Sequence, residues 1–207
     1  MDQPTPVIAD IVQSRKLPDR AATQQAIQEA INAVEKPFAV PAGMKPTVGD
    51  EFQAVYASLA QARRILVQLK LSLPEEVELR FGIGVGEISQ VSGTALQDGP
   101  GWYAARAAIE EAESRAKSAQ SWVRSWVGDA ADNSRVADLN SSLLLEDFLL
   151  SKMKPRERRL TLMALQGQTQ IEMARVEKIS QSAVSQSLQR SGGAALIAAI
   201  QLGEGEQ

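Results

Sequence analysis

The stretch from Val77 to Ile88, VELRFGIGVGEI, constrains the fold more than any other part of the chain. Its apolar side chains alternate with Arg80 and with three glycines, which is the period of two expected of a β-strand. A helix would not tolerate three glycines there, whereas glycines along one face of a strand let something large approach its backbone closely. The sequence therefore predicts a strand that is packed on both faces.

Strand-like and helix-like segments alternate through the first 130 residues. The strands we expect are 6–12, the two halves of a hairpin over 47–56, 77–88 and 121–128. The helices we expect, from apolar residues three and four apart, are 22–36, 58–71 and 102–120. This order predicts an α+β fold with one sheet and helices packed on a face of it.

The rest of the chain is predicted to be helical after a polar linker over residues 129–141. The expected helices are 142–153, 155–166, two shorter ones and an apolar one over 194–202. We therefore expect three parts. They are a sheet domain (1–130), a linker with a connecting helix (131–150) and an all-helical domain (151–207).

The residue types that are missing exclude several classes of function. The chain has no cysteine and no histidine. Disulfides, zinc fingers, thiol nucleophiles and histidine proton carriers are therefore ruled out, and any metal must be held by carboxylates. The sequence also lacks a signal-like start and any run of about 18 apolar residues. We expect a cytoplasmic protein with no membrane partner.

Charge is distributed unevenly along the chain. Residues 1–150 hold 14 Lys and Arg against 20 Asp and Glu, whereas residues 151–207 hold 8 against 5. Phosphate groups are met by basic side chains. If the protein binds nucleic acid, we expect the C-terminal domain to make the contact.

Residues 169–190, TQIEMARVEKISQSAVSQSLQR, have the pattern of a helix-turn-helix. Small Ala174 suits the place where two helices cross, and apolar Ile179 suits the turn. Val184 and Leu188 lie one turn apart on the second helix, as packing requires. The alternative interpretation is an ordinary helical hairpin with a polar surface.

The second helix of this motif begins near Ser180, whose hydroxyl can cap it, and is predicted to bind double-stranded DNA. Short amides and hydroxyls reach base edges, and glutamine pairs well with adenine. The candidate base-reading residues are Gln181, Ser182, Ser185, Gln186 and Gln189. The candidate phosphate contacts are Arg175, Arg190, Lys152, Lys154, Arg156, Arg158 and Arg159.

The run from Pro155 to Arg190 also resembles the region of sigma factors and related regulators that reads promoter elements. It departs from that pattern at Lys178, where such turns usually carry glycine. The resemblance implies that the helix after Lys178 recognises DNA.

Two aspartates are candidates for a divalent metal site. Asp10 lies near the end of the predicted strand 6–12, and Asp50 lies in the predicted hairpin turn. Two carboxylates from separate strands suit a hard cation, and magnesium there would bridge them to the phosphates of a nucleotide. The alternative is that Asp50 merely suits a tight turn and that Asp10 pairs with a basic neighbour.

Four segments follow the order of the corresponding segments of class III nucleotide cyclases, namely VIADIV, KPTVGDEFQAVY, LRFGIGVGEI and WYAARAAIEEA. The GDEF string is also similar to that of diguanylate cyclases. The resemblance implies a ferredoxin-like, nucleotide cyclase-like domain with metals on Asp10 and Asp50. Over nearly all 207 residues the chain resembles the SatD family, in which a cyclase-like part precedes a helix-turn-helix. TVGDEFQ, QDGPGW and ISQSAVSQ are the most specific pieces.

The candidate nucleotide-binding residues come from this resemblance and from the residues themselves. The helix start at Gly99 to Gly101 offers backbone N–H groups to an anion, and Trp102 could stack on a purine. The set is Ile11, Lys45, Gly99, Gly101, Trp102 and Arg106, for a nucleotide of the ATP or GTP type with magnesium. Otherwise Trp102 would be a core anchor and Arg106 a solvated charge.

The chain departs from class III cyclases at two positions that their chemistry uses. Trp102 stands where those enzymes have an asparagine, four residues before Arg106, and Pro46 replaces the base-reading lysine, with Lys45 one residue away. We expect nucleotide binding without cyclisation, in a homodimeric regulator whose effector controls operator binding. The alternatives are an active nucleotidyl cyclase fused to a helix-turn-helix, and a protein-interaction module.

Overall fold

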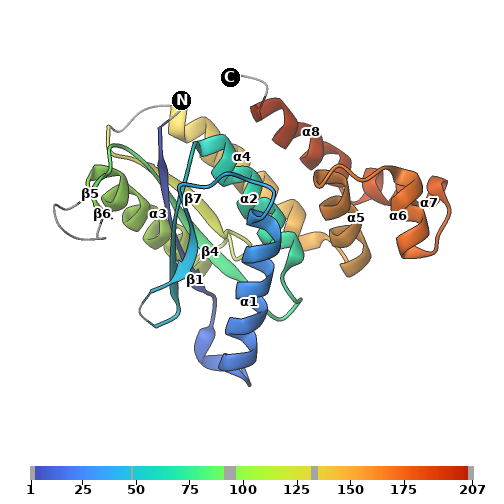
Figure 1. The fold of residues 1–207 in the computed structure, drawn as a ribbon, viewed down its shortest axis with the longest axis horizontal. Coiled ribbons are helices and arrows are strands. Elements are labelled where there is room, and N and C mark those ends of the chain that lie inside the picture. Colours follow the sequence, from blue (N-terminus) through green and yellow to red (C-terminus); the bar gives the residue numbers. More distant parts are fainter. Residues whose placement is uncertain (1–2, 48, 91–96, 132–134, 205–207) are drawn as a thin grey trace.

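The computed structural model describes residues 3–47, 49–90, 97–131 and 135–204. A five-stranded sheet in the order β2-β3-β1-β4-β7 forms its centre (Figure 1). The strands are β1 Thr5–Ile11, β2 Ala42–Pro46, β3 Glu51–Tyr56, β4 Leu79–Val85 and β7 Ser125–Asp129. The first four pair antiparallel, and β7 pairs parallel to β4. Shorter elements are the 3₁₀ helix η1 Ser14–Lys16 and a separate pair of strands, β5 Ser89–Gln90 and β6 Gln97–Asp98.

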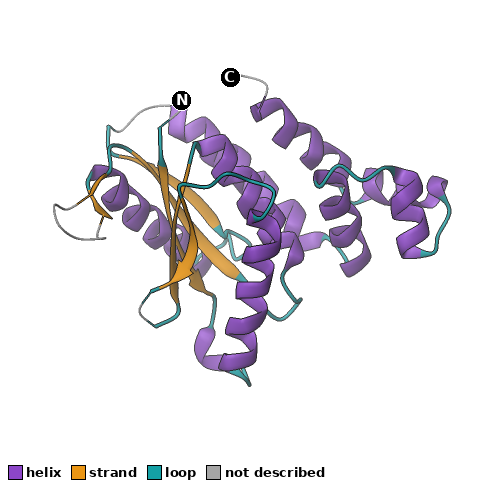
Figure 2. Cartoon of the chain, viewed as in Figure 1, coloured by secondary structure: helices purple, strands orange, loops and turns teal. Residues whose placement is uncertain are grey.

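Helices cover both faces of this sheet (Figure 2). They are α1 Arg20–Glu35, α2 Leu59–Ser72, α3 Pro100–Lys117 and α4 Arg135–Lys152. Helices α1, α2 and α4 share an apolar core with alternate strand residues such as Val7 and Phe81. Helix α3 packs on Ile8, and because successive side chains of a strand point to opposite faces, it lies on the other side of the sheet.

Local signals begin these helices. Asp19 caps α1 by accepting the N–H of Ala22, and Ser58 caps α2 by accepting the N–H of Gln61. Pro100 occupies the first turn of α3, where its missing N–H costs nothing. The helices therefore begin where their sequences favour it.

A row of glycines lets α3 approach the sheet at backbone distance. A Cβ atom on Gly82 would overlap the carbonyl oxygen of Ala105, and one on Gly84 would overlap that of Gly101. Gly128 of β7 is covered in the same way by the carbonyl of Ala104. The large neighbour that the glycines of the 77–88 segment predict is therefore α3.

Four helices complete the chain, namely α5 Pro155–Leu165, α6 Gln170–Glu177, α7 Gln181–Arg190 and α8 Gly193–Glu204. They enclose a small apolar core, whose buried members are Leu160, Met163, Met173, Val184 and Leu188. Within the described ranges, no helix is both long enough and apolar enough to cross a membrane.

These C-terminal helices pack directly on α2. A second apolar cluster joins Val67 and Leu71 of α2 to Leu165, Leu196 and Ile200. Arg64 adds a 3.1 Å hydrogen bond from α2 to the carbonyl of Leu165, and Arg158 of α5 donates back to the carbonyl of Lys70. A displacement of α2 would therefore also shift α5 and α8, which pack on it.

The linker predicted over 129–141 is wrong from Arg135 onward, where α4 begins. Asn140 is buried in this helix, and its amide group makes hydrogen bonds of 2.8 and 2.9 Å to the N–H and C=O of Val127. The amide satisfies backbone hydrogen-bonding groups of the edge strand β7. This role, and not a loop, accounts for the polar residue at this position. The hairpin also differs, because its first strand ends at Pro46. The three-part division of the chain stays a prediction.

We expect Gly84→Ala to lower the free energy of unfolding by about 3 kcal/mol, because its methyl group would overlap backbone atoms of α3. Gly49→Ala is the matched control. That glycine has a φ of +77° and no atom within 4 Å of an added Cβ, so its cost should be limited to about 1 kcal/mol. Urea unfolding measures both, and a loss at Gly84 no larger than at Gly49 would contradict the close contact.

Candidate functional site

A cluster of charged side chains lies between the sheet and α3. Glu51, Asp10 and Arg80 stand opposite one another on β3, β1 and β4, so their side chains share the face that α3 covers. Arg106 of α3 binds Glu51 through hydrogen bonds of 2.6 and 2.9 Å, and Glu113 of α3 lies 3.2 Å from Arg80. We call these five residues the charged cluster.

Asp10 is only partly compensated within the charged cluster. Arg80 approaches its Oδ2 at 3.5 Å, while its buried Oδ1 has no hydrogen-bond partner among the described residues. Burial raises the pKa of Asp10, Arg80 lowers it, and three nearby carboxylates raise it further. These are Glu113, Asp50 and Glu51. A cation beside Asp10 would relieve both the repulsion and the unsatisfied oxygen.

Asp50 is held at the same end of the sheet. Its Oδ2 accepts a 2.6 Å hydrogen bond from the hydroxyl of Ser14, which lies in η1 just after β1. The structure thus brings the two predicted aspartates together. Among the residues that are described, no group of three or more acidic side chains is arranged to hold a metal ion. A cation there would take its other ligands from water or phosphate, as magnesium commonly does.

The start of α3 is built tightly into the chain. The N–H of Gly99 donates to Asp98 Oδ1 at 2.7 Å, and that of Gly101 donates to the carbonyl of Glu87 at 3.0 Å. A Cβ on Gly101 would lie 2.7 Å from the carbonyl oxygen of Gly86, so packing alone requires glycine there. These N–H groups are engaged and are not the free anion donors that the sequence predicts.

The other predicted nucleotide-binding residues are spread over the sheet. Trp102 packs against β1 on the α3 side, and its buried Nε1 has no partner in the described part of the chain. Lys45 is exposed on the edge strand β2, and the side chain of Ile11 packs into the core on the opposite face. Of the six predicted nucleotide-binding residues, Arg106 is the one that belongs to the charged cluster.

The sequence did not single out Glu51, Arg80 or Glu113. Arg80 alternates with the glycines of β4, and this alternation could have placed it on the face that α3 covers. Glu113 could not be found, because its place depends on how α3 sits on the glycines.

Helices α6 and α7 meet at a turn of residues 178–180. Lys178 has left-handed backbone angles, with φ 55° and ψ 46°, and its N–H donates to the carbonyl of Ala174. This conformation favours glycine and costs another residue about 1–2 kcal/mol. Lys178 therefore has the left-handed backbone conformation that glycine adopts most easily, at the position where turns between such helices usually carry glycine.

One face of α7 is anchored and the other is polar. Ser180 caps the helix by accepting the N–H of Ala183 at 3.1 Å, and Val184 and Leu188 are buried. The exposed residues are Gln181, Ser182, Gln186, Gln189 and Arg190, and Ser185 is half-buried. Arg190 donates to Gln186 Oε1 at 3.0 Å, so the two side chains form a pair on the surface.

The basic residues around α7 differ in their accessibility. Arg175 is exposed on α6, and Arg190 is exposed at the end of α7. Arg159 is engaged by Glu177 through hydrogen bonds of 2.7 and 2.8 Å, and Arg158 reaches α2 instead. Arg175 and Arg190 are therefore the better placed of the predicted phosphate contacts.

Comparison with known proteins identifies the family. A family model described as the SatD family matches residues 5–198, which include both the sheet and the C-terminal helices. The protein therefore belongs to the SatD family. No curated protein matches the chain.

We expect Asp10→Asn to raise the melting temperature of the metal-free protein by a few degrees, because it removes a poorly compensated charge. Glu76→Gln, an exposed carboxylate before β4, is a matched control and should change little. Thermal unfolding at pH 7 with a chelator measures both. A lower melting temperature for Asp10→Asn would mean that its pairing with Arg80 outweighs the repulsion.

Proposed function

We propose that the protein is a DNA-binding transcriptional regulator that recognises an operator with α7. The polar, exposed face of this helix carries the proposal. Amide and hydroxyl side chains on an accessible helix suit base edges in the major groove. The left-handed Lys178 and the capping Ser180 support a helix-turn-helix, in which α6 lies across the DNA backbone and α7 enters the groove.

A homodimer is part of this proposal. A single helix of ten residues reads few bases, and two copies would read half-sites about one helical turn, or 34 Å, apart. The excess of basic over acidic residues in 151–207 supports the same partner.

The sheet part supports a ferredoxin-like, nucleotide cyclase-like domain. Its elements follow the order β1-α1-β2-β3-α2-β4, and these four strands lie in the sheet order β2-β3-β1-β4. This is the arrangement of split βαβ folds. Membership of the SatD family agrees with it.

We propose that Asp10 and Asp50 bind a nucleotide of the ATP or GTP type through a divalent cation such as magnesium. The unsatisfied Oδ1 of Asp10 fits such a cation, since it is a buried acceptor without a partner in the described chain. The cation would neutralise phosphate charge there. Arg106 binds Glu51, which stands opposite Asp10 in the sheet, and would add a second positive charge once released from Glu51.

The residue at position 102 argues against cyclisation of the nucleotide. Trp102 packs on β1, and an indole offers a single N–H donor and no acceptor. It cannot replace the amide that orients the ribose in class III cyclases, so we propose a nucleotide sensor. Incubation with ATP or GTP and magnesium or manganese tests this, because a steady yield of cyclic nucleotide would show an enzyme.

We expect Gln186→Ala and Arg190→Ala to weaken DNA binding in different ways. Gln186→Ala should cost roughly 1–3 kcal/mol on the preferred sequence and little on random DNA, since it loses a base contact. Arg190→Ala should weaken binding to both and make the salt dependence shallower by about one unit, since it loses a phosphate contact. Binding assays on operator and scrambled duplexes at several salt concentrations supply these values.

Gln166→Ala is the control for these variants, because Gln166 is an exposed glutamine that follows α5 and is not part of α7. It should bind both duplexes like the parent protein. Operator binding that is unchanged in both Gln186→Ala and Arg190→Ala would exclude α7 as the recognition helix.

We expect Asp10→Asn and Asp50→Asn each to abolish magnesium-dependent stabilisation by ATP or GTP. In the parent protein, ligand at one hundred times its dissociation constant should add about 2.7 kcal/mol of stability. Asp138→Asn, an exposed aspartate of α4, should respond like the parent. Thermal shifts with and without magnesium measure this, and equal shifts in both aspartate variants and the parent would remove the metal site.

A further inference from the structure

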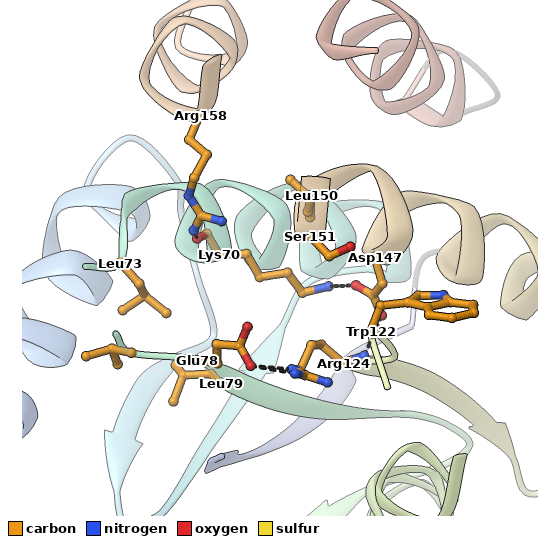
Figure 3. A pocket seen from close by; sticks show the side chains of 11 residues that line it. Lys70, Leu73, Glu78, Leu79, Trp122, Arg124, Asp147, Leu150, Ser151 and Arg158 are labelled. Atoms are coloured by element: carbon orange, nitrogen blue, oxygen red, sulfur yellow. Dashed lines mark hydrogen bonds and ion pairs between the residues drawn. The ribbon is translucent and has the colours of Figure 1, made fainter. Parts of the chain in front are cut away.

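A pocket of about 60 Å³ lies where the sheet meets the C-terminal helices (Figure 3). Its walls come from α2, α4, α5, β4 and the segment before β7. It is separate from the charged cluster and from the exposed face of α7. This space is enough for about four waters, or for the end of a small organic molecule.

Three cationic side chains line the pocket, and two of them have carboxylate partners. Lys70 lies 2.5 Å from Asp147, and Arg124 binds Glu78 at 2.5 and 2.9 Å. Arg158 reaches from α5 to the backbone carbonyl of Lys70 and forms no ion pair within the described ranges. The Arg158 guanidinium is therefore the charge in this pocket without a directly bound anion.

The position of the Arg158 guanidinium favours the binding of an anion beside it. Burial lowers the pKa of Arg158, against a smaller opposite effect of Glu78 and Glu75. Arginine nevertheless keeps its proton in proteins, so its charge is partly removed from water without full compensation. A bound carboxylate would supply that compensation with two parallel hydrogen bonds.

The remaining walls of the pocket select against a strongly hydrated anion. Leu73, Val77, Leu79 and Leu150 are apolar lining residues of the pocket, whereas the Trp122 ring points away from Arg158 (Figure 3). Phosphate would lose hydration against these side chains, whereas an apolar group would gain from contact with them.

We propose that this pocket binds a small monocarboxylate with an apolar body, such as a short-chain or aromatic acid. Arg158 holds the carboxylate, and the apolar body lies against the leucines and the valine that line the pocket. Because the lining comes from α2, α4 and α5, the ligand strengthens the packing of the C-terminal helices on the sheet part. This site does not depend on nucleotide binding or on DNA binding.

Titration of the full chain with butyrate and benzoate at constant ionic strength tests the proposal, with ligand-observed NMR and thermal unfolding as readouts. For ligands of this size we expect saturable binding with a dissociation constant of about 1 mM and a rise in melting temperature. The neutral amides butyramide and benzamide should bind at least about tenfold more weakly. Inorganic phosphate should not compete.

Arg158→Gln should weaken benzoate binding by about tenfold or more. Arg156→Gln, two residues earlier on α5 and exposed, should leave it unchanged. Arg158→Lys keeps the positive charge but lacks the planar guanidinium group, so it should weaken benzoate binding by an intermediate factor. This variant also tests the proposal if Arg158→Gln fails to fold. The proposal is overturned by any of three results: neither acid binds the parent protein, amides or phosphate bind as well as acids, or Arg156→Gln weakens binding as much as the Arg158 variants.

Discussion

Helix α3 rests on the sheet at backbone distance, and the charged cluster depends on that contact. At Gly82, Gly84 and Gly128 no side chain separates the strand from α3, so main-chain contacts help to set the register of α3 over β4 and β7. Arg106 then meets Glu51, and Glu113 meets Arg80. Without the glycine row α3 would have to move away from the sheet, and Asp10 would lose its covered, poorly compensated environment.

The sheet and the C-terminal helices are joined through α2 and α4. Asp147 of α4 accepts the N–H groups of Arg124 and Ser125 at 2.7 Å and pairs with Lys70 of α2. The apolar cluster on α2 then continues into α5 and α8. A ligand that shifts the sheet part therefore has a packed route to α7, which is the physical basis for the proposed control of DNA binding by an effector.

Features with local causes could be predicted from the sequence. The glycine alternation indicated a strand with a close neighbour, and Ser180 marked the cap of α7 because capping depends on a few adjacent residues.

Features that depend on packing between distant segments could not be predicted from the sequence. Asn140 looked like part of a loop, although it satisfies the edge strand from inside a helix. Arg158 looked like a phosphate contact, although α5 directs it to α2. Asp10 and Asp50 were paired from their places on separate strands and from the resemblance to cyclases, whereas Glu51 and Arg80 emerged from strand register.

The central claim is that this SatD family protein recognises DNA through α7. Nuclease footprinting of the full chain on genomic fragments that it selects, at low and high salt, tests it most directly. The account predicts a discrete protected site with two related half-sites about one helical turn apart, and protection that fades as salt rises. An absence of protection at either salt concentration, or binding that is uniform along all fragments, would contradict sequence recognition by this helix.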